Sequence, residues 1–219
     1  MSQTKNGVWS SSLLQSQIKT EDVRLPEMLF GYLIGPFGAL LASGIFTSQL
    51  QNYLTNVLKL DLGFLTMLQL LSTILIVAAN LVVGQLIERT RTLAGKARPW
   101  ILLSALTLSV PSVLMFIVPF EDRTARMVWI AISYNAYYAI GFPIYNTANS
   151  TLVPVSTRSS QQRSTLASLT NIASLGVMGV GSMIFPTLVS MALKEDQHLW
   201  FAAMLGVAVF TALTVLLQF

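Results

Sequence analysis

Six apolar runs constrain this 219-residue chain more strongly than any other feature of its sequence. Each run is close to the roughly 20 residues that a helix needs to cross the hydrocarbon core of a bilayer. Only 10% of the residues are charged, whereas a soluble domain usually carries about 25%. The sequence therefore predicts an all-α membrane protein, a bundle of six transmembrane helices. We expect the spans at residues 29–54, 62–87, 99–119, 127–149, 164–190 and 199–219.

The segment before the first run is polar, and the distribution of basic residues predicts its side of the membrane. Residues 1–28 contain no apolar centre of the kind that a cleavable signal peptide requires. Nine of the 13 Lys and Arg residues lie in this segment and in the second and fourth connections. Lys and Arg concentrate in the connections that stay cytoplasmic. We therefore expect residues 1–28 to form a cytoplasmic N-terminal tail.

Ionisable residues are confined to the tail and the connections, which limits the possible chemistry. All nine Asp and Glu residues lie there, the chain has no cysteine, and its single histidine is His198. A membrane enzyme needs a nucleophile, a metal or paired acids at depth, so we expect neither an enzyme nor a metal or cofactor site. The basic residues are not interleaved with aromatic ones as in nucleic-acid binders. We expect no nucleic-acid partner.

The connection between the second and third runs carries a recognisable pattern, GQLIERTRTLAGKARPW, over residues 84–100. Its characteristic residues are Gly84, Glu88, Arg89, Arg91, Gly95, Lys96 and Arg98, followed by Pro99 and Trp100. This pattern resembles the signature between the second and third helices of the glycoside–pentoside–hexuronide:cation symporters, a branch of the major facilitator superfamily. That signature is roughly G-x-x-x-D-R-T-R-x-x-x-G-K-x-R-P-W. Glu88 stands in place of the usual Asp.

The resemblance implies one half of a major facilitator fold, in which two six-helix halves enclose a solute site near the bilayer midplane. The expected function is that of the N-terminal half of a secondary transporter working by alternating access in the bacterial inner membrane. The expected partners are a small-molecule solute, membrane lipid, and a second six-helix half or another copy of this chain. The residues of the signature are expected to set orientation and to take part in gating.

A coupling cation, Na⁺ or H⁺, stays open, but the residues at the family's cation site lack the usual carboxylates. The family tends to carry one Asp in the first helix and two in the second. Pro36, Ile76 and Asn80 occupy the corresponding positions here. Asn80 offers a neutral ligand oxygen, and it is the one residue left as a candidate for this site.

The fourth run is the most polar of the six, and it supplies most of the candidate solute-binding residues. At 100° per residue, Tyr134, Tyr138, Tyr145 and Asn149 fall within about 60° of one another on a helix. Aromatic rings beside amide and hydroxyl groups suit a sugar. Asn171 joins this set, because it stands eight residues beyond Arg163, where the family often has a sugar-binding Arg. The expected solute is neutral and polar, a sugar or a glycoside.

Two alternatives to this transporter interpretation stay open. Asn and Tyr side chains also form hydrogen bonds between spanning helices, so the polar face of the fourth run can serve packing alone. The chain can then be a truncated, inactive product, or a non-catalytic subunit that assembles with another membrane protein. A face that is dry and buried against protein would favour these alternatives, and a face lining a cavity would favour the transporter.

Overall fold

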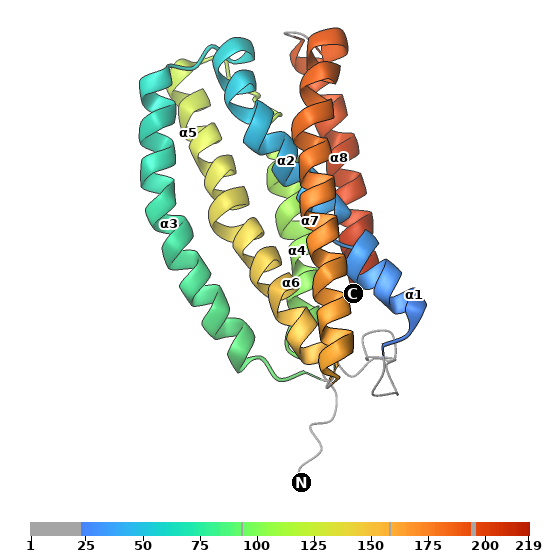
Figure 1. The fold of residues 1–219 in the computed structure, drawn as a ribbon. Coiled ribbons are helices and arrows are strands. Elements are labelled where there is room, and N and C mark those ends of the chain that lie inside the picture. The colour runs from blue at the N-terminus through green and yellow to red at the C-terminus, as the bar shows by residue number, and fades with distance from the viewer. Residues whose placement is uncertain (1–22, 93, 158, 194–195) are drawn as a thin grey trace.

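The computed structural model describes residues 23–92, 94–157, 159–193 and 196–219, and within them the chain forms an all-helical bundle (Figure 1). Most of the predicted tail, residues 1–22, lies outside the described residues. The remainder of that tail is not a free segment, because the first helix already begins at Leu25. The predicted all-α bundle of six helical segments is confirmed.

The bundle contains six helical segments, three of which include π-helical stretches (η). The first segment comprises α1 (Leu25–Glu27), η2 (Met28–Ile34), α2 (Phe37–Asn52) and η3 (Tyr53–Val57). The second and third are α3 (Leu62–Arg89) and α4 (Arg98–Leu114). The fourth comprises α5 (Arg123–Asn135), η4 (Ala136–Gly141) and α6 (Phe142–Ser156). The fifth comprises α7 (Ser160–Leu188) and η5 (Val189–Leu193), and the sixth is α8 (Gln197–Gln218).

Among the described residues, four helices are long and apolar enough to cross a membrane. They are Leu25–Val57, Leu62–Arg89, Ser160–Leu193 and Gln197–Gln218. Arg98–Leu114 is apolar but shorter, with 17 residues. The fourth segment is long but rich in Tyr, Asn, Ser and Thr, and it does not reach the same hydropathy.

Aspartates begin three of the helices. The carboxylates of Asp61, Asp122 and Asp196 accept hydrogen bonds from backbone N–H groups in the first turns of α3, α5 and α8, at 3.3, 2.9 and 2.8 Å. A side-chain oxygen at this position satisfies a backbone donor that the helix leaves unpaired. Half of the six described carboxylates therefore have a structural role at helix starts.

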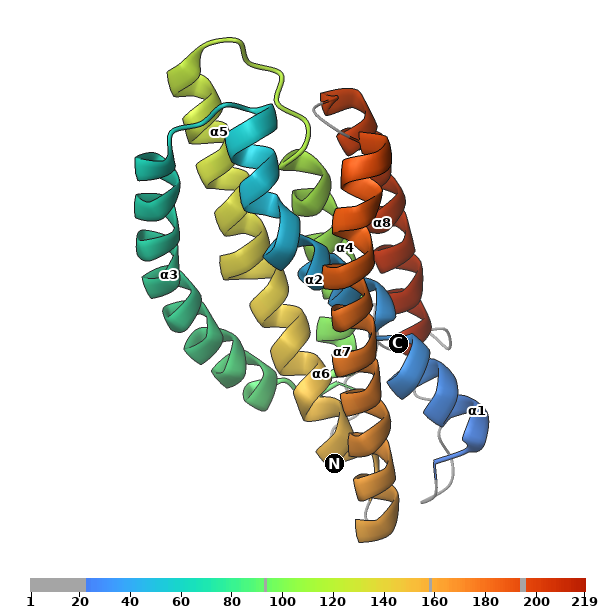
Figure 2. The ribbon, with the colours of Figure 1, turned by 45° about the horizontal axis from the view of Figure 1, so that its top comes forward.

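The helices form two layers, which are visible in both views. In Figures 1 and 2, α2, α6 and α7 lie on the near side of the bundle, α4 and α8 lie behind them, and α3 stands at one edge. Helix α2 packs against α7 and α8, α4 packs against α8 and α6, and α3 packs against α6. The near layer therefore presents the outer faces of the first, fourth and fifth segments on one side of the molecule.

Aromatic side chains fill the space between the layers. The ring centroids of Tyr53 and Phe116 are 4.5 Å apart, those of Phe46 and Tyr137 4.6 Å, and those of Tyr53 and Trp200 5.2 Å. All five side chains are almost fully buried. Edge-on and tilted contacts at these distances are favourable beyond the burial of area. They join the first, third, fourth and sixth segments.

One glycine permits the close approach of the third and fourth segments. A Cβ atom added at Gly141, in η4, would collide with the backbone carbonyl of Thr107 in α4. Small residues at helix contacts let backbones approach closely in membranes. Gly206, in α8, has no atom within 4 Å of the corresponding Cβ position.

We expect Gly141→Ala to lower the free energy of unfolding by about 2 kcal/mol, because the added methyl group must push two backbones apart. Gly206→Ala makes the same chemical change in open space and should leave stability nearly unchanged. Reversible unfolding in mixed micelles, followed by circular dichroism, measures both. Equal effects of the two substitutions would contradict the close packing of η4 on α4.

Candidate functional site

The structure separates the four predicted residues of the fourth segment into two pairs. The rings of Tyr134 and Tyr138 are stacked at a tilt, with centroids 4.5 Å apart. Further along the segment, the Asn149 carboxamide oxygen accepts a hydrogen bond from the amide of Gln218 in α8, at 2.6 Å. Tyr145 lies beside the same Gln218 side chain. The first pair is in the upstream half of the segment, and Tyr145 and Asn149 are in α6.

A π-helical stretch that contains Tyr138 separates Tyr134 from the second pair and explains why a single helical projection is inadequate. The amide of Phe142 donates to the carbonyl of Tyr137, five residues earlier. Each such bond encloses one more residue than an α-helical bond, so the 100° step does not hold across Ala136–Gly141. Pro143 follows directly and has no N–H to donate. The angular relation predicted between Tyr134 and Asn149 is therefore changed by this stretch.

Tyr145 and Asn149 are enclosed by the bundle. Their exposed fractions are 1% and 9%, and that of Gln218 is 4%. The Tyr145 hydroxyl and the Gln218 carboxamide oxygen are buried, with no hydrogen-bond partner among the described residues. This enclosed, polar contact between α6 and α8 has the geometry that interhelical packing produces. Gln218 was missed by the sequence analysis, although a lone amide in an apolar run needs a polar partner.

Tyr138 is the more accessible member of the upstream pair. Tyr134 is buried, whereas Tyr138 is half-buried and also meets the edge of Tyr137, with ring centroids 5.0 Å apart. The stacked rings of Tyr134 and Tyr138 restrain one another. Tyr138 is therefore partly open to contact, and the two neighbouring rings restrain its orientation.

On the near-layer helices, exposed polar side chains lie among apolar ones such as Leu175 and Met183, whereas the exposed residues of the far layer are almost all apolar. We define the polar face by its exposed residues: Thr47 and Gln51 of α2, Asn146 and Ser150 of α6, and Asn171 of α7. On α4 the exposed residues are Leu103, Leu106 and Val110. On α8 they are apolar or glycine, apart from His198 in the first turn.

Asn146 and Asn171 lie at similar depth. Asn146 is ten residues before Ser156, the end of α6, and Asn171 is eleven residues after Ser160, the start of α7. These two helices are consecutive and in contact. The side-chain amides of Gln51, Asn146 and Asn171 have no hydrogen-bond partner among the described residues. Asn171 was predicted from the sequence as a solute-binding residue, whereas Asn146 was not.

The candidate cation residue, Asn80, is half-buried in α3. Its side-chain amide donates to the carbonyl of Ile76, one turn earlier, at 2.8 Å. Within the part of the chain that the structure describes, no group of three His, Cys, Asp or Glu residues is arranged to hold a metal ion. Asn80 thus supplies one neutral oxygen without an acidic neighbour from its own helix.

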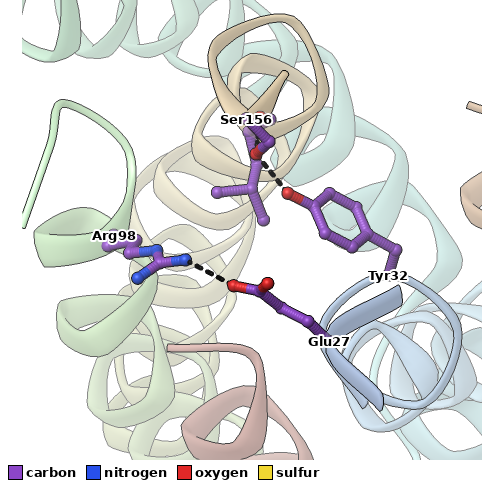
Figure 3. A network of polar contacts seen from close by, with 5 residues as sticks. Glu27, Tyr32, Arg98 and Ser156 are labelled. Carbon is purple, nitrogen blue, oxygen red and sulfur yellow. Dashed lines mark hydrogen bonds and ion pairs between the residues drawn. The ribbon is translucent and has the colours of Figure 1, made fainter. Parts of the chain in front are cut away.

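The signature between α3 and α4 contributes to a polar network that ties the first segment to the third and fourth. Arg98 forms an ion pair with Glu27 at 3.4 Å, and the Tyr32 hydroxyl donates to Ser156 (Figure 3). Glu27 and Tyr32 come from the start of the first segment, Arg98 from the start of α4, and Ser156 from the end of α6. The other charged residues of the signature, Glu88, Arg89, Arg91 and Lys96, are exposed.

The two glycines of the signature differ in their roles. Gly95 has φ +95°, in the left-handed region that favours glycine. Its amide donates to the carbonyl of Thr92 at 3.0 Å and closes a tight turn. Gly84 is half-buried within α3, with nothing within 4 Å of its Cβ position. The turn therefore requires Gly95, whereas the described packing does not require Gly84.

Comparisons with known proteins agree with this architecture. Residues 31–219 match the family described as MFS/sugar transport protein. The chain is 26% identical over 166 residues to the uncharacterized symporter YjmB of Bacillus subtilis, covering 74% of this chain and 36% of that protein. It is 26% identical to the isoprimeverose transporter of Lactiplantibacillus pentosus, over 82% of this chain and 38% of that protein. It is 23% identical to the inner membrane symporter YicJ of Escherichia coli, over 91% of this chain and 43% of that protein. The chain thus spans less than half the length of these relatives.

We predict an energetic coupling of about 1 kcal/mol between Asn149 and Gln218, in the range of hydrogen bonds between spanning helices. A double-mutant cycle with Asn149→Ala, Gln218→Ala and the double variant measures it. The reported quantity is the free energy of unfolding in mixed micelles. Strictly additive effects of the two substitutions would contradict the hydrogen bond between α6 and α8.

Proposed function

Because the chain belongs to the MFS/sugar transport protein family, we propose that it forms the N-terminal half of a secondary transporter that moves a neutral sugar or glycoside by alternating access. The chain is an integral membrane protein with helical spans. One relative is named as an isoprimeverose transporter and others as symporters. These names support a sugar-like solute.

The observation that carries the proposal is the contrast between the two layers of the bundle. Lipid-facing helices require apolar surfaces, as α4 and α8 have. The exposed amides of Gln51, Asn146 and Asn171 would be costly against lipid, since they have no partner among the described residues. A water-filled cavity on the side of the near layer satisfies them. We therefore assign the polar face to the solute pathway.

The chemistry of this face suits a neutral solute. Its members are amides and hydroxyls, which donate and accept hydrogen bonds to sugar hydroxyls. The exposed part of Tyr138 supplies an aromatic surface for the apolar side of a sugar ring, and Tyr134 holds that ring in place. We assign Asn146 and Asn171 to hydrogen bonding with the solute. Tyr145 and Asn149 hold α6 against α8 in this account.

Transport by this protein should not depend on a cation gradient. Carboxylates are the usual ligands for coupling ions within membranes, and the described residues place none on the polar face. Asn80 provides one amide oxygen on α3, and its amide nitrogen donates one hydrogen bond to its own helix. A single neutral oxygen is a weak ligand for Na⁺ and cannot carry a proton.

The remaining parts of the proposal concern the assembly and its orientation. A second six-helix half, or another copy of this chain, would cover the polar face and close the solute pathway. We place the protein in the bacterial inner membrane with its N terminus in the cytoplasm. The ion pair of Glu27 with Arg98 would then lie at the cytoplasmic end.

Uptake into proteoliposomes tests this function. The 219-residue protein, and any longer product of the same reading frame, should be offered neutral sugars and glycosides with and without Na⁺ and H⁺ gradients. We expect uptake without either gradient. Asn146→Ala and Asn171→Ala should lower the apparent affinity about tenfold, the cost of one lost hydrogen bond to the solute. Thr107→Ala, on the apolar side of the bundle, serves as a control.

Three results would contradict parts of this proposal. Strict dependence on a Na⁺ or H⁺ gradient would refute the cation-independent mechanism. Uptake unaffected by Asn146→Ala and Asn171→Ala would place the solute elsewhere. Absence of uptake by every product, with the folded protein recovered in a complex with another membrane protein, would favour an assembly subunit, for which the buried contact of Asn149 with Gln218 is the supporting observation.

A further inference from the structure

A groove of about 470 Å³ opens on the outer surface of the bundle beside the turn that joins α3 and α4. It is lined at one end by polar residues of the connection and further on by apolar residues of α4. Its main lining residues are Thr90, Thr92, Trp100, Leu102, Leu103 and Leu106. The groove lies away from the polar face and has no role in the proposed transport mechanism.

The indole ring of Trp100 has a fixed position at the polar end of the groove. Its N–H donates to the hydroxyl of Thr90 at 2.9 Å, across the gap between the end of α3 and the start of α4. Tryptophan at this position is typical of the boundary between headgroups and hydrocarbon. The groove therefore begins at the level of lipid headgroups.

The apolar end of the groove continues along α4. Leu103 and Leu106 are 43% and 64% exposed, and Val110, one turn further, is 47% exposed. These positions recur at helical spacing on one side of α4. Together they form an apolar strip that runs from the groove toward the middle of the membrane.

The turn at the polar end of the groove carries two cations, Arg91 and Lys96. Thr92 and Gly95 form an antiparallel bridge, and the Thr92 hydroxyl donates to the Gly95 carbonyl at 2.6 Å. Arg91 directly precedes Thr92 and Lys96 directly follows Gly95, so both cations belong to the turn at this end of the groove. Both are exposed and form no ion pair with a described residue. Arg98, by contrast, is paired with Glu27.

We propose that this groove is a binding site for one anionic glycerophospholipid. Its phosphate lies between Arg91 and Lys96, and one acyl chain follows Leu103 and Leu106 along α4. Charge complementarity selects the occupant, since basic residues at the membrane surface attract anionic lipid. A second six-helix half that covers the polar face would leave the groove open, because α4 belongs to the opposite layer (Figure 1).

Native mass spectrometry of the purified 219-residue protein in detergent tests the site. The probes are phosphatidylglycerol and phosphatidylcholine with identical palmitoyl and oleoyl chains. We expect one phosphatidylglycerol to bind in preference to phosphatidylcholine. The double variant Arg91→Gln/Lys96→Gln should weaken that binding about tenfold or more, because two cations near the headgroup are lost. The matched control is Lys59→Gln/Arg123→Gln, which removes two exposed cations from the opposite end of the bundle.

A second pair of variants tests the apolar part of the groove. Leu103→Trp fills it and should abolish the preference for phosphatidylglycerol. Leu213→Trp adds the same ring at a 58% exposed position on α8 and should not. Circular dichroism and thermal melting confirm that each variant remains folded.

Several outcomes would overturn the proposal. These are equal binding of the two lipids, equal effects of the two charge variants, or unchanged binding in Leu103→Trp. Displacement of the lipid by millimolar glycerol phosphate would indicate a site for free phosphate instead. If lipid binds only after residues 1–22 are removed, the occupant of the groove in the intact protein is that segment and not a lipid.

Discussion

The hydrocarbon core of a bilayer offers no hydrogen-bond donors or acceptors, so each polar side chain of a spanning helix needs a partner in protein or in water. Many of the described Ser and Thr hydroxyls meet this need by donating to a carbonyl one turn earlier, as Thr47 and Ser133 do. Asn149 and Gln218 meet it by pairing between helices. Asn146 and Asn171 have neither solution among the described residues. Their position on one side of the bundle is therefore the strongest structural support for a solute pathway.

Helix length and apolar composition were sufficient to predict the bundle, because a spanning helix must satisfy both. The motif after Gly84 was sufficient to predict the family to which the chain belongs. The position of each polar side chain was harder to predict. The π-helical bond from Phe142 to Tyr137 alters the helical register, and the sequence analysis did not predict it. The ion pair of Arg98 with Glu27 was also missed, since Glu27 belonged to a segment expected to be a tail.

The fourth segment combines two functions that its sequence does not distinguish. On one side, Tyr145 and Asn149 are enclosed and fix α6 against α8. On the other side, Asn146 and Ser150 are exposed, although Asn146 directly follows Tyr145 and Ser150 directly follows Asn149. Adjacent residues of a helix point about 100° apart, so a single polar run can both hold the bundle together and line a cavity. This explains why packing alone stayed open as an alternative to solute binding.

The central claim is that the polar face meets water within the membrane, and thiol accessibility tests it most directly. The chain contains no cysteine, so single substitutions can be introduced without first removing native thiols. Membrane-impermeant maleimide should label Asn146→Cys and Asn171→Cys in proteoliposomes. It should fail to label Leu106→Cys and Leu213→Cys, which are also exposed in the bundle but belong to the apolar side. Protection of all four positions, each shown to be reactive after solubilisation in denaturant, would mean that the polar face is dry and would contradict the account.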